Sequence, residues 1–299
     1  MEQYFAGREI IKTSEIDAYN GEPLFNCVFV NETVDKDWHK SHLKIHRSTF
    51  AEMGFRDSKF EQCDLSFCIF IDCYFKKTYF TQVKFLSCIF INCNFDMATF
   101  SNCDFSYASF SDCFISYSQM KNNLPRQKEN LCADICRNLS LQCLLKGNIE
   151  DYKEYLYEER RAGEIHAIKK LFHKKGTYYD KYNFIDGVSG FFEFLRSKLS
   201  KFLWGYGERI GVLIRNIILV ITLYGIVYYR HMKDIVWRDT SSNSIAKVFY
   251  LSACNFFSVH GESIAKTIYL HAVEMSEHIL GLILMSFFCA ALFRQINRR

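Results

Sequence analysis

Large apolar residues recur at every fifth position across the middle of the chain. Between Ile45 and Met120, all 16 positions at multiples of five are large and apolar, and twelve of them are phenylalanine. A mostly small side chain, often cysteine, stands two residues before each of these positions. Neither an α-helix, with a period of 3.6, nor a flat strand, with a period of 2, explains this spacing. The fixed period predicts a stacked solenoid, in which each unit buries its apolar face against its neighbours.

Five residues on each of four sides make a square coil of about 20 residues. Coils that stack at the inter-strand spacing of about 4.8 Å predict roughly four turns over residues 43–122. The large residue and the small residue before it both point inward, and their alternation in size fills the interior. We expect residues 1–42 to form an irregular segment, with "FNCVFVNE" at 25–32 as an outlying coil.

This pattern of a small residue, any residue, Phe or Leu and two polar residues resembles the pentapeptide-repeat family. The resemblance implies a right-handed quadrilateral β-helix. Some members of that family mimic DNA with an acidic surface. Residues 44–115 here carry seven basic and eight acidic side chains, so the lattice is close to neutral and does not favour DNA mimicry.

The hydrophobic period becomes helical after Pro125. Leu131, Ile135, Leu139 and Cys143 recur at intervals of four, and Asn148 follows Gly147 as the cap of a second helix that ends near Phe172. Residues 125–189 are therefore predicted to be a cytosolic helical connector. The next segment, 190–207, is amphipathic and basic. We expect it to lie at a membrane interface, with a core-packing helix as the alternative.

Two later segments are apolar enough to cross a membrane. Residues 210–229 have the required length, and a second span is predicted over about 272–294. Arg215 lies near one end of the first span, and Tyr224, Tyr228 and Tyr229 are expected to anchor its other end at the interface. The basic residues that flank the spans place both termini on the cytosolic side of the cell (inner) membrane. No apolar signal segment opens the chain.

A third apolar segment lies between the two spans and is too short to cross. Residues 244–257 predict a re-entrant helix, and the polar turn "SVHGE" at 258–262 follows it. The order of span, short helix, turn and span is similar to the two-transmembrane pore module of potassium-channel-type proteins. That resemblance implies four subunits around one axis and a pore module over residues 208–299. The turn lacks the TVGYG pattern of a potassium filter.

The resemblance assigns roles to two sets of residues. Those expected to line the ion pathway are Ser258, Val259, His260, Gly261 and Glu262, and those expected to support the pore are Asn255, Phe257, Glu277 and Gly281. Rings of His260 and Glu262 would favour a monovalent or divalent cation and add a dependence on pH. Glu277 is expected either to brace the short helix or to contact the ion directly. His271, Glu274 and His278 are either functional or simply at the interface.

Composition excludes several other functions. The net charge of +4 comes without a concentrated basic face, which argues against a nucleic-acid partner. Most of the 13 cysteines follow the lattice rather than paired ligand spacings, so we interpret them as reduced fillers in a reducing compartment. His39, His42 and His46 lack a metal-site context. "GYG" at 205–207 precedes the first span and is expected to be a turn.

We therefore expect an α+β membrane protein, a homotetrameric cation channel with a pentapeptide-repeat platform, neither an enzyme nor dependent on a cofactor. The alternative is a scaffold anchored in the lipid bilayer that binds protein partners without conduction.

Overall fold

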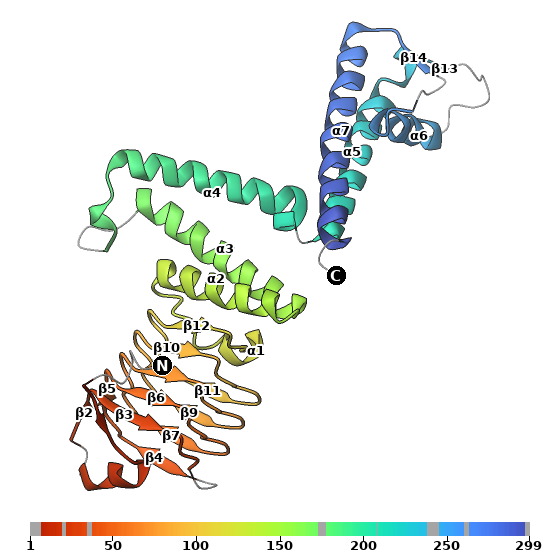
Figure 1. Ribbon diagram of the computed structural model, residues 1–299. Coiled ribbons are helices and arrows are strands. Elements are labelled where there is room, and N and C mark those ends of the chain that lie inside the picture. The colour runs from red at the N-terminus through yellow and green to blue at the C-terminus, as the bar shows by residue number, and fades with distance from the viewer. Residues whose placement is uncertain are drawn as a thin grey trace. The chain divides into compact units, whose positions relative to one another are not determined.

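The computed structural model describes residues 7–19, 22–34, 38–172, 178–207, 209–237, 245–259 and 263–296. The chain divides into two compact units, Met1–Phe191 and Phe192–Arg299. The first unit contains short strands and helices, and the second is mainly helical (Figure 1).

The N-terminal unit begins with a β-helix of short parallel strands. One face is a sheet in the order β1-β3-β6-β8-β10-β12, a second face is a sheet in the order β11-β9-β7-β4, and β2 pairs with β5. Single-residue bridges, such as Lys44 to Asp64 and Tyr74 to Asn94, complete the remaining faces. The predicted solenoid is confirmed: the four turns expected over residues 43–122 supply β6, β8, β10 and β12, and the outlying coil expected at 25–32 adds β3, which makes about five turns in all. The elements are β1 (Glu9–Ile10), η2 (Thr13–Tyr19), β2 (Leu24–Phe25), β3 (Cys27–Val30), β4 (His39–Ser41), β5 (Ile45–His46), β6 (Thr49–Ala51), β7 (Lys59–Glu61), β8 (Ile69–Ile71), β9 (Tyr79–Thr81), β10 (Ile89–Ile91), β11 (Thr99–Ser101) and β12 (Ser109–Ser111).

The first coil carries one extra residue. Thr49 pairs with Ile69 at the regular step of 20 residues, whereas Val28 pairs with Thr49 at a step of 21. His39 pairs with Lys59 at the regular step again, so the extra residue falls between positions 33 and 39. This insertion moves Phe29 off the multiples of five, although the outlying coil expected at 25–32 does join the sheet as β3.

Phenylalanine rings fill the β-helix in columns. Phe90 stacks on Phe70 and Phe110 with ring centroids 4.9 and 5.1 Å apart and nearly parallel planes. It also meets Phe85 and Phe95 edge to face, at 5.6 and 5.5 Å. Offset stacked and edge-to-face rings are the favourable aromatic geometries. The repeat of the strands therefore matches the repeat that the rings prefer.

The small inward residues are hydrogen-bond donors as well as fillers. The Sγ atoms of Cys68 and Cys88 lie 3.1 and 2.9 Å from the carbonyl oxygens of Ile45 and Leu65, one coil below. Burial raises the pKa of the Cys68 thiol to about 12, so it stays protonated at neutral pH and retains a proton to donate. All 13 cysteines are free thiols in the structure.

Every corner of the coil adopts left-handed backbone geometry. Each fifth residue from His42 to Asp112 has a positive φ, between 51° and 64°. This region costs an ordinary L-residue about 1–2 kcal/mol, whereas asparagine and glycine enter it readily. The corner position therefore favours Asn or Asp, as at Asn92 and Asp72.

We expect Met97→Asn to stabilise the β-helix by about 0.5–1 kcal/mol, because Met97 is an exposed corner residue with a φ of 57°. Hydrogen exchange of the coil amides measures the change. Thr99→Asn is the matched control, since Thr99 lies in strand β11 and an exchange for asparagine there removes a good strand former. Equal shifts in both variants would contradict a corner effect.

Side-chain amides close the C-terminal end of the β-helix. Asn123 accepts from Cys103 N at 2.8 Å and donates to Phe100 O at 3.1 Å. Asn138 makes the same pair of bonds with the backbone of Phe110, at 2.9 and 3.0 Å. Each amide takes the place of the peptide groups of a further coil, so the last strands keep their hydrogen bonds.

Helices α1 (Tyr117–Met120) and α2 (Glu129–Leu145) pack on this end, and α3 (Ile149–Leu171) packs against α2. The short η3 (Tyr178–Lys181) and α4 (Phe184–Trp204) follow in the chain. The four residues spaced by four, Leu131 to Cys143, are all buried, which confirms the packing face predicted for α2.

Glu129 forms an ion pair with Lys169 and accepts from Tyr179 Oη at 2.8 Å. Burial alone would raise the pKa of Glu129, but these hydrogen bonds outweigh it and the pKa is lowered.

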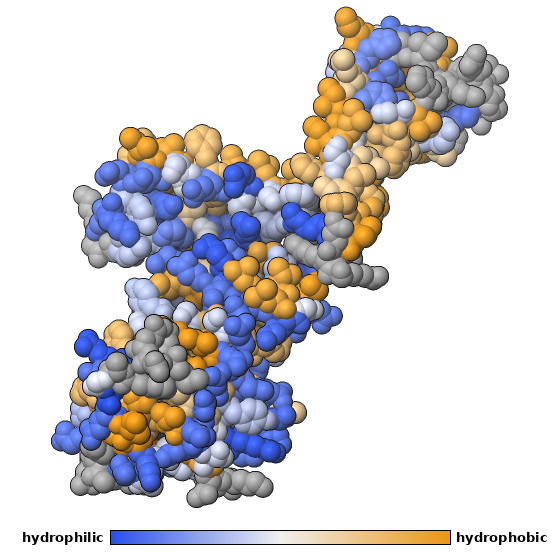
Figure 2. Space-filling model, in the orientation of Figure 1, coloured by the Kyte–Doolittle hydropathy of each residue, from blue (hydrophilic) through white to orange (hydrophobic). Residues whose placement is uncertain are grey.

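The C-terminal unit contains two long apolar helices and a short one. The elements after α4 are η4 (Gly205–Gly207), α5 (Ile210–Arg230), η5 (Met232–Asp234), β13 (Ile235–Trp237), α6 (Ile245–Phe256), β14 (Ser263–Ala265) and α7 (Ile268–Ile296). Helix α5 and residues 268–294 of α7 are candidate membrane spans. Only 17% of the most apolar stretch of α5 and 22% of that of α7 is buried, whereas the core helix of a soluble protein is mostly buried. Hydrophobic residues gather over α5 and α7 in Figure 2.

Candidate functional site

Helix α6 packs against both candidate spans, and a glycine lies at each contact. A Cβ atom on Gly225 of α5 would lie 2.5 Å from Cδ1 of Phe249, and one on Gly281 of α7 would lie 2.1 Å from the carbonyl oxygen of Phe256. Real Cβ contacts are not this short. The two glycines therefore let α6 approach both long helices more closely than any other residue would allow.

A buried polar network joins the same three helices. Glu277 of α7 is fully buried, and its carboxylate accepts from Tyr228 Oη of α5 at 2.7 Å and from Ser252 Oγ of α6 at 2.5 Å. Asn255 of α6 donates to Tyr228 Oη at 3.1 Å. Each member thus has a partner, as buried polar groups require. The network fixes the depth and rotation of α6 between α5 and α7.

The C-terminal end of α6 is closed by a Schellman motif. Val259 N donates to Cys254 O at 2.8 Å, and Ser258 N donates to Asn255 O at 3.0 Å. Ser258 adopts the left-handed conformation, with a φ of 56°, that this motif needs. Phe257, Ser258 and Val259 are all exposed. The chain therefore leaves α6 through a defined turn whose side chains point away from the packed core.

The structure brings together part of the set expected to support the pore. Asn255 and Glu277 share one network and Gly281 contacts Phe256, while Phe257 is exposed. His260, Gly261 and Glu262 lie outside the described residues.

Three contributors to this site were not assigned to it from the sequence. Tyr228 was expected to be an interfacial anchor, but it is fully buried and bonded to Glu277, whereas Tyr229 is exposed. Ser252 and Gly225 were not singled out. The inward position of Tyr228 could not be predicted, because three tyrosines near one end of an apolar helix do not indicate which of them faces inward. The only sequence signal for Gly225 is a small residue inside an apolar helix.

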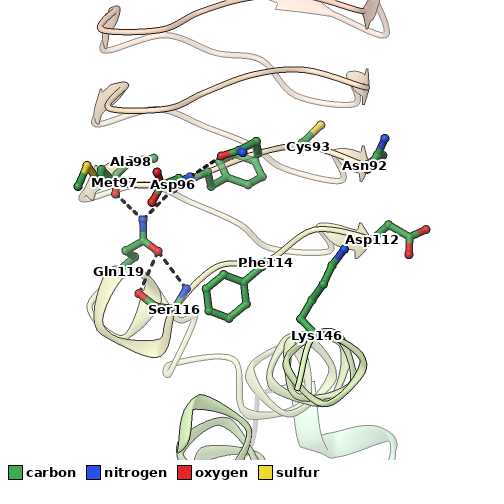
Figure 3. A pocket seen from close by; sticks show the side chains of 12 residues that line it. Asn92, Cys93, Asp96, Met97, Ala98, Asp112, Phe114, Ser116, Gln119 and Lys146 are labelled. Atoms are coloured by element: carbon green, nitrogen blue, oxygen red, sulfur yellow. Dashed lines mark hydrogen bonds between the residues drawn. The ribbon is translucent and has the colours of Figure 1, made fainter. Parts of the chain in front are cut away.

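A groove of about 550 Å³ lies at the closed end of the β-helix, in the N-terminal unit. Figure 3 shows Gln119 reaching toward Ala98 while it also bonds to Ser116, with Lys146 on the opposite side. Asp96 at its edge pairs with Lys76 at 2.7 Å. Its polar groups hold the cap together, and they offer no nucleophile paired with a base.

The histidines of "WHKSHLKIH" make separate contacts. His39 Nε2 lies 3.4 Å from Glu61 and His46 Nε2 lies 3.2 Å from Asp64. Within the described ranges, no cluster of three or more His, Cys, Asp or Glu side chains is arranged to hold a metal.

Comparisons with known proteins bear on the β-helix. Residues 55–85 and 88–116 match the family model "Pentapeptide repeats (8 copies)". No curated protein matches the chain.

Solved structures of QnrB1, described as a plasmid-mediated fluoroquinolone resistance protein, are similar to part of the chain. One trypsin-treated variant is 21% identical, with a TM-score of 0.22, and the match covers 31% of this chain and 54% of QnrB1. A second trypsin-treated variant is 20% identical, with a TM-score of 0.24 and coverages of 37% and 55%. The chain thus spans about half the length of these two structures. From its family-model match and its stacked coils, the β-helical part of this chain is a pentapeptide-repeat domain.

Proposed function

We propose that the C-terminal unit forms a cation-conducting membrane pore by assembly of several copies of this chain, four by resemblance to two-transmembrane pore modules. The pentapeptide-repeat domain serves as a cytosolic platform. The observation that carries the proposal is the short helix α6, which is fixed between two candidate spans by the Glu277 network and two close glycine contacts.

The length of α6 supports a re-entrant position. Its 12 residues extend about 18 Å, which is less than the hydrocarbon thickness of about 30 Å. A segment of this kind enters and returns on the same side, and non-helical backbone at membrane depth is tolerated only beside protein or water. The exposed turn at Ser258 and Val259 would then line an aqueous path that neighbouring copies enclose.

The buried carboxylate also fits a membrane function. Ionisable groups inside membrane proteins are costly and are kept at functional positions. A simple anchor needs two apolar helices, but it needs neither a third helix nor a polar network. We assign Glu277 the role of bracing α6, because both of its hydrogen bonds come from neighbouring helices.

The preference for cations is proposed from the sequence. Glu262 and His260 follow the turn of α6, and a ring of acidic side chains near an outer mouth favours cations. Arg215, Arg230 and Arg294 lie near the ends of the spans, which suits the interfaces better than the pore.

We expect the full-length protein, reconstituted in a planar bilayer, to conduct and to give a reversal potential near that of the cation under a KCl gradient. Replacement of K⁺ by Na⁺ should change the current modestly, because the turn lacks a potassium filter. Protein-free bilayers with the same detergent carry-over are the control. An anion-selective reversal potential, or silent bilayers with verified insertion, would refute the proposal.

The second candidate is a membrane-anchored scaffold, which the pentapeptide-repeat domain and its open groove beside Met97 and Lys146 favour. Size measurement of the detergent-solubilised protein separates the two. An assembly of about four chains supports the pore, whereas a monomer or dimer supports the scaffold.

A further inference from the structure

Helix α4 carries an apolar face that is largely exposed among the described residues. At 100° per residue, most of its apolar side chains fall within an arc of about 120°, with Phe194 and Trp204 outside it. Ile185, Phe192, Leu195, Leu199 and Phe202 on this arc are between 42% and 80% exposed. Asp186, Glu193 and Ser200 lie on the opposite side of the helix.

A different side of α4 packs against α3. A Cβ atom on Gly190 would lie 2.5 Å from Ala167 O, and one on Gly187 would lie 2.9 Å from Cδ1 of Leu171. These contacts occupy the glycine side of α4, so the exposed arc takes no part in the packing against α3. It is a second surface of α4.

The end of α4 is tied to the candidate spans. Asn216 of α5 is buried and donates to the carbonyl oxygens of Phe202 and Leu203 at 2.6 and 2.9 Å. The Trp204 ring packs on Phe287 of α7 with centroids 5.0 Å apart, and the Arg294 guanidinium lies over it at 5.8 Å. Asn216 lies in the second turn of α5, so the last turn of α4 is held at the level where that span begins.

We propose that the apolar arc of α4 lies in the headgroup region of an anionic lipid bilayer. This inference rests on the membrane position of α5 in the proposed function. Arg196 and Lys198 stand at the two borders of the arc, where their stems cover apolar surface and their charges meet lipid phosphates. A protein partner of ordinary surface would not require a basic residue on both borders.

Site-specific fluorescence in vesicles tests the proposal. Cys289 is the one exposed cysteine among the described residues and the others are buried, so Cys289→Ser provides a labelling background. A polarity-sensitive probe is attached in the full-length protein at Leu199→Cys on the arc, at Glu193→Cys on the opposite side, or at Leu219→Cys within α5. Lipids brominated at shallow or deep acyl positions serve as quenchers, in vesicles with phosphatidylglycerol or with phosphatidylcholine alone.

In phosphatidylglycerol vesicles, the Leu199 probe should be quenched most by shallow bromines, the Glu193 probe little, and the Leu219 probe by deep bromines. Removing charge with Arg196→Gln and Lys198→Gln should weaken surface binding of α4 about fivefold per residue, and remove its preference for the anionic lipid. Equal weak quenching at Leu199 and Glu193 with deep quenching at Leu219 overturns the α4 assignment alone. Loss of quenching at Leu219 as well overturns the membrane position of α5 too.

Discussion

Phe90→Ala is expected to lower the free energy of opening of the central coils by about 3–5 kcal/mol. Phe90 is fully buried and contacts four other phenylalanine rings, two by stacking and two edge to face. Its removal leaves a cavity between two rigid strands that cannot collapse, because the strand spacing is fixed. In a solenoid each coil is stabilised by its neighbours, so the effect should concentrate on strands β8, β10 and β12.

Hydrogen exchange of the full-length protein, resolved by peptide, measures that opening free energy coil by coil. Ile89→Ala is the matched control, since Ile89 is the adjacent residue of the same strand and its side chain is 40% exposed. In the Ile89→Ala variant, the opening free energy of the central coils should change by less than about 1 kcal/mol. Similar losses for the two variants would show that the phenylalanine columns are not the main source of stability.

Gly281→Ala is expected to reduce cation conduction strongly while the protein still inserts. The added methyl group would meet a backbone carbonyl at 2.1 Å, so α6 or α7 has to move as a whole. Overpacking of this kind costs about 1–3 kcal/mol. If only the seated position of α6 conducts, that cost lowers its population about 5- to 150-fold. Cation flux into proteoliposomes, normalised to the incorporated protein, measures the loss.

Gly211→Ala is the control for this variant. Nothing lies within 4 Å of a Cβ atom at Gly211, which is a helical residue of α5. The Gly211→Ala substitution should leave the cation flux unchanged and stabilise the helix slightly. If Gly281→Ala conducted as well as Gly211→Ala, the seating of α6 against α7 would have no part in conduction.

The β-helix could be predicted from sequence because its period is a direct image of its geometry. The phenylalanines from Phe50 to Phe110 are buried, as their spacing predicts, and no contact with a distant segment of the chain is needed to place them. The coil around Phe29 was harder, since one inserted residue shifts the register without changing the fold. The amide caps could not be recognised from the pattern, because Asn123 and Asn138 each act through a pair of hydrogen bonds to backbone groups at least 20 residues away.

The candidate site was less predictable because it depends on contacts between distant segments. Glu277 was recognised as an ionisable residue in an apolar helix, but its partners Tyr228 and Ser252 come from two other helices. The rotation of each helix about its axis decides which tyrosine faces inward. When a helix is apolar on most sides, its hydropathy pattern gives little information about that rotation.

The amide caps have a consequence for the length of the β-helix. Asn123 stands where the small residue of one more turn would stand, 20 positions after Cys103, and makes only local bonds to the turn beneath it. The hydrogen bonds of this cap do not depend on how many turns precede it. Whole turns can therefore be added or removed by duplication or deletion upstream, which would change the reach of the rod by fixed increments and leave its junction with the helices as it is.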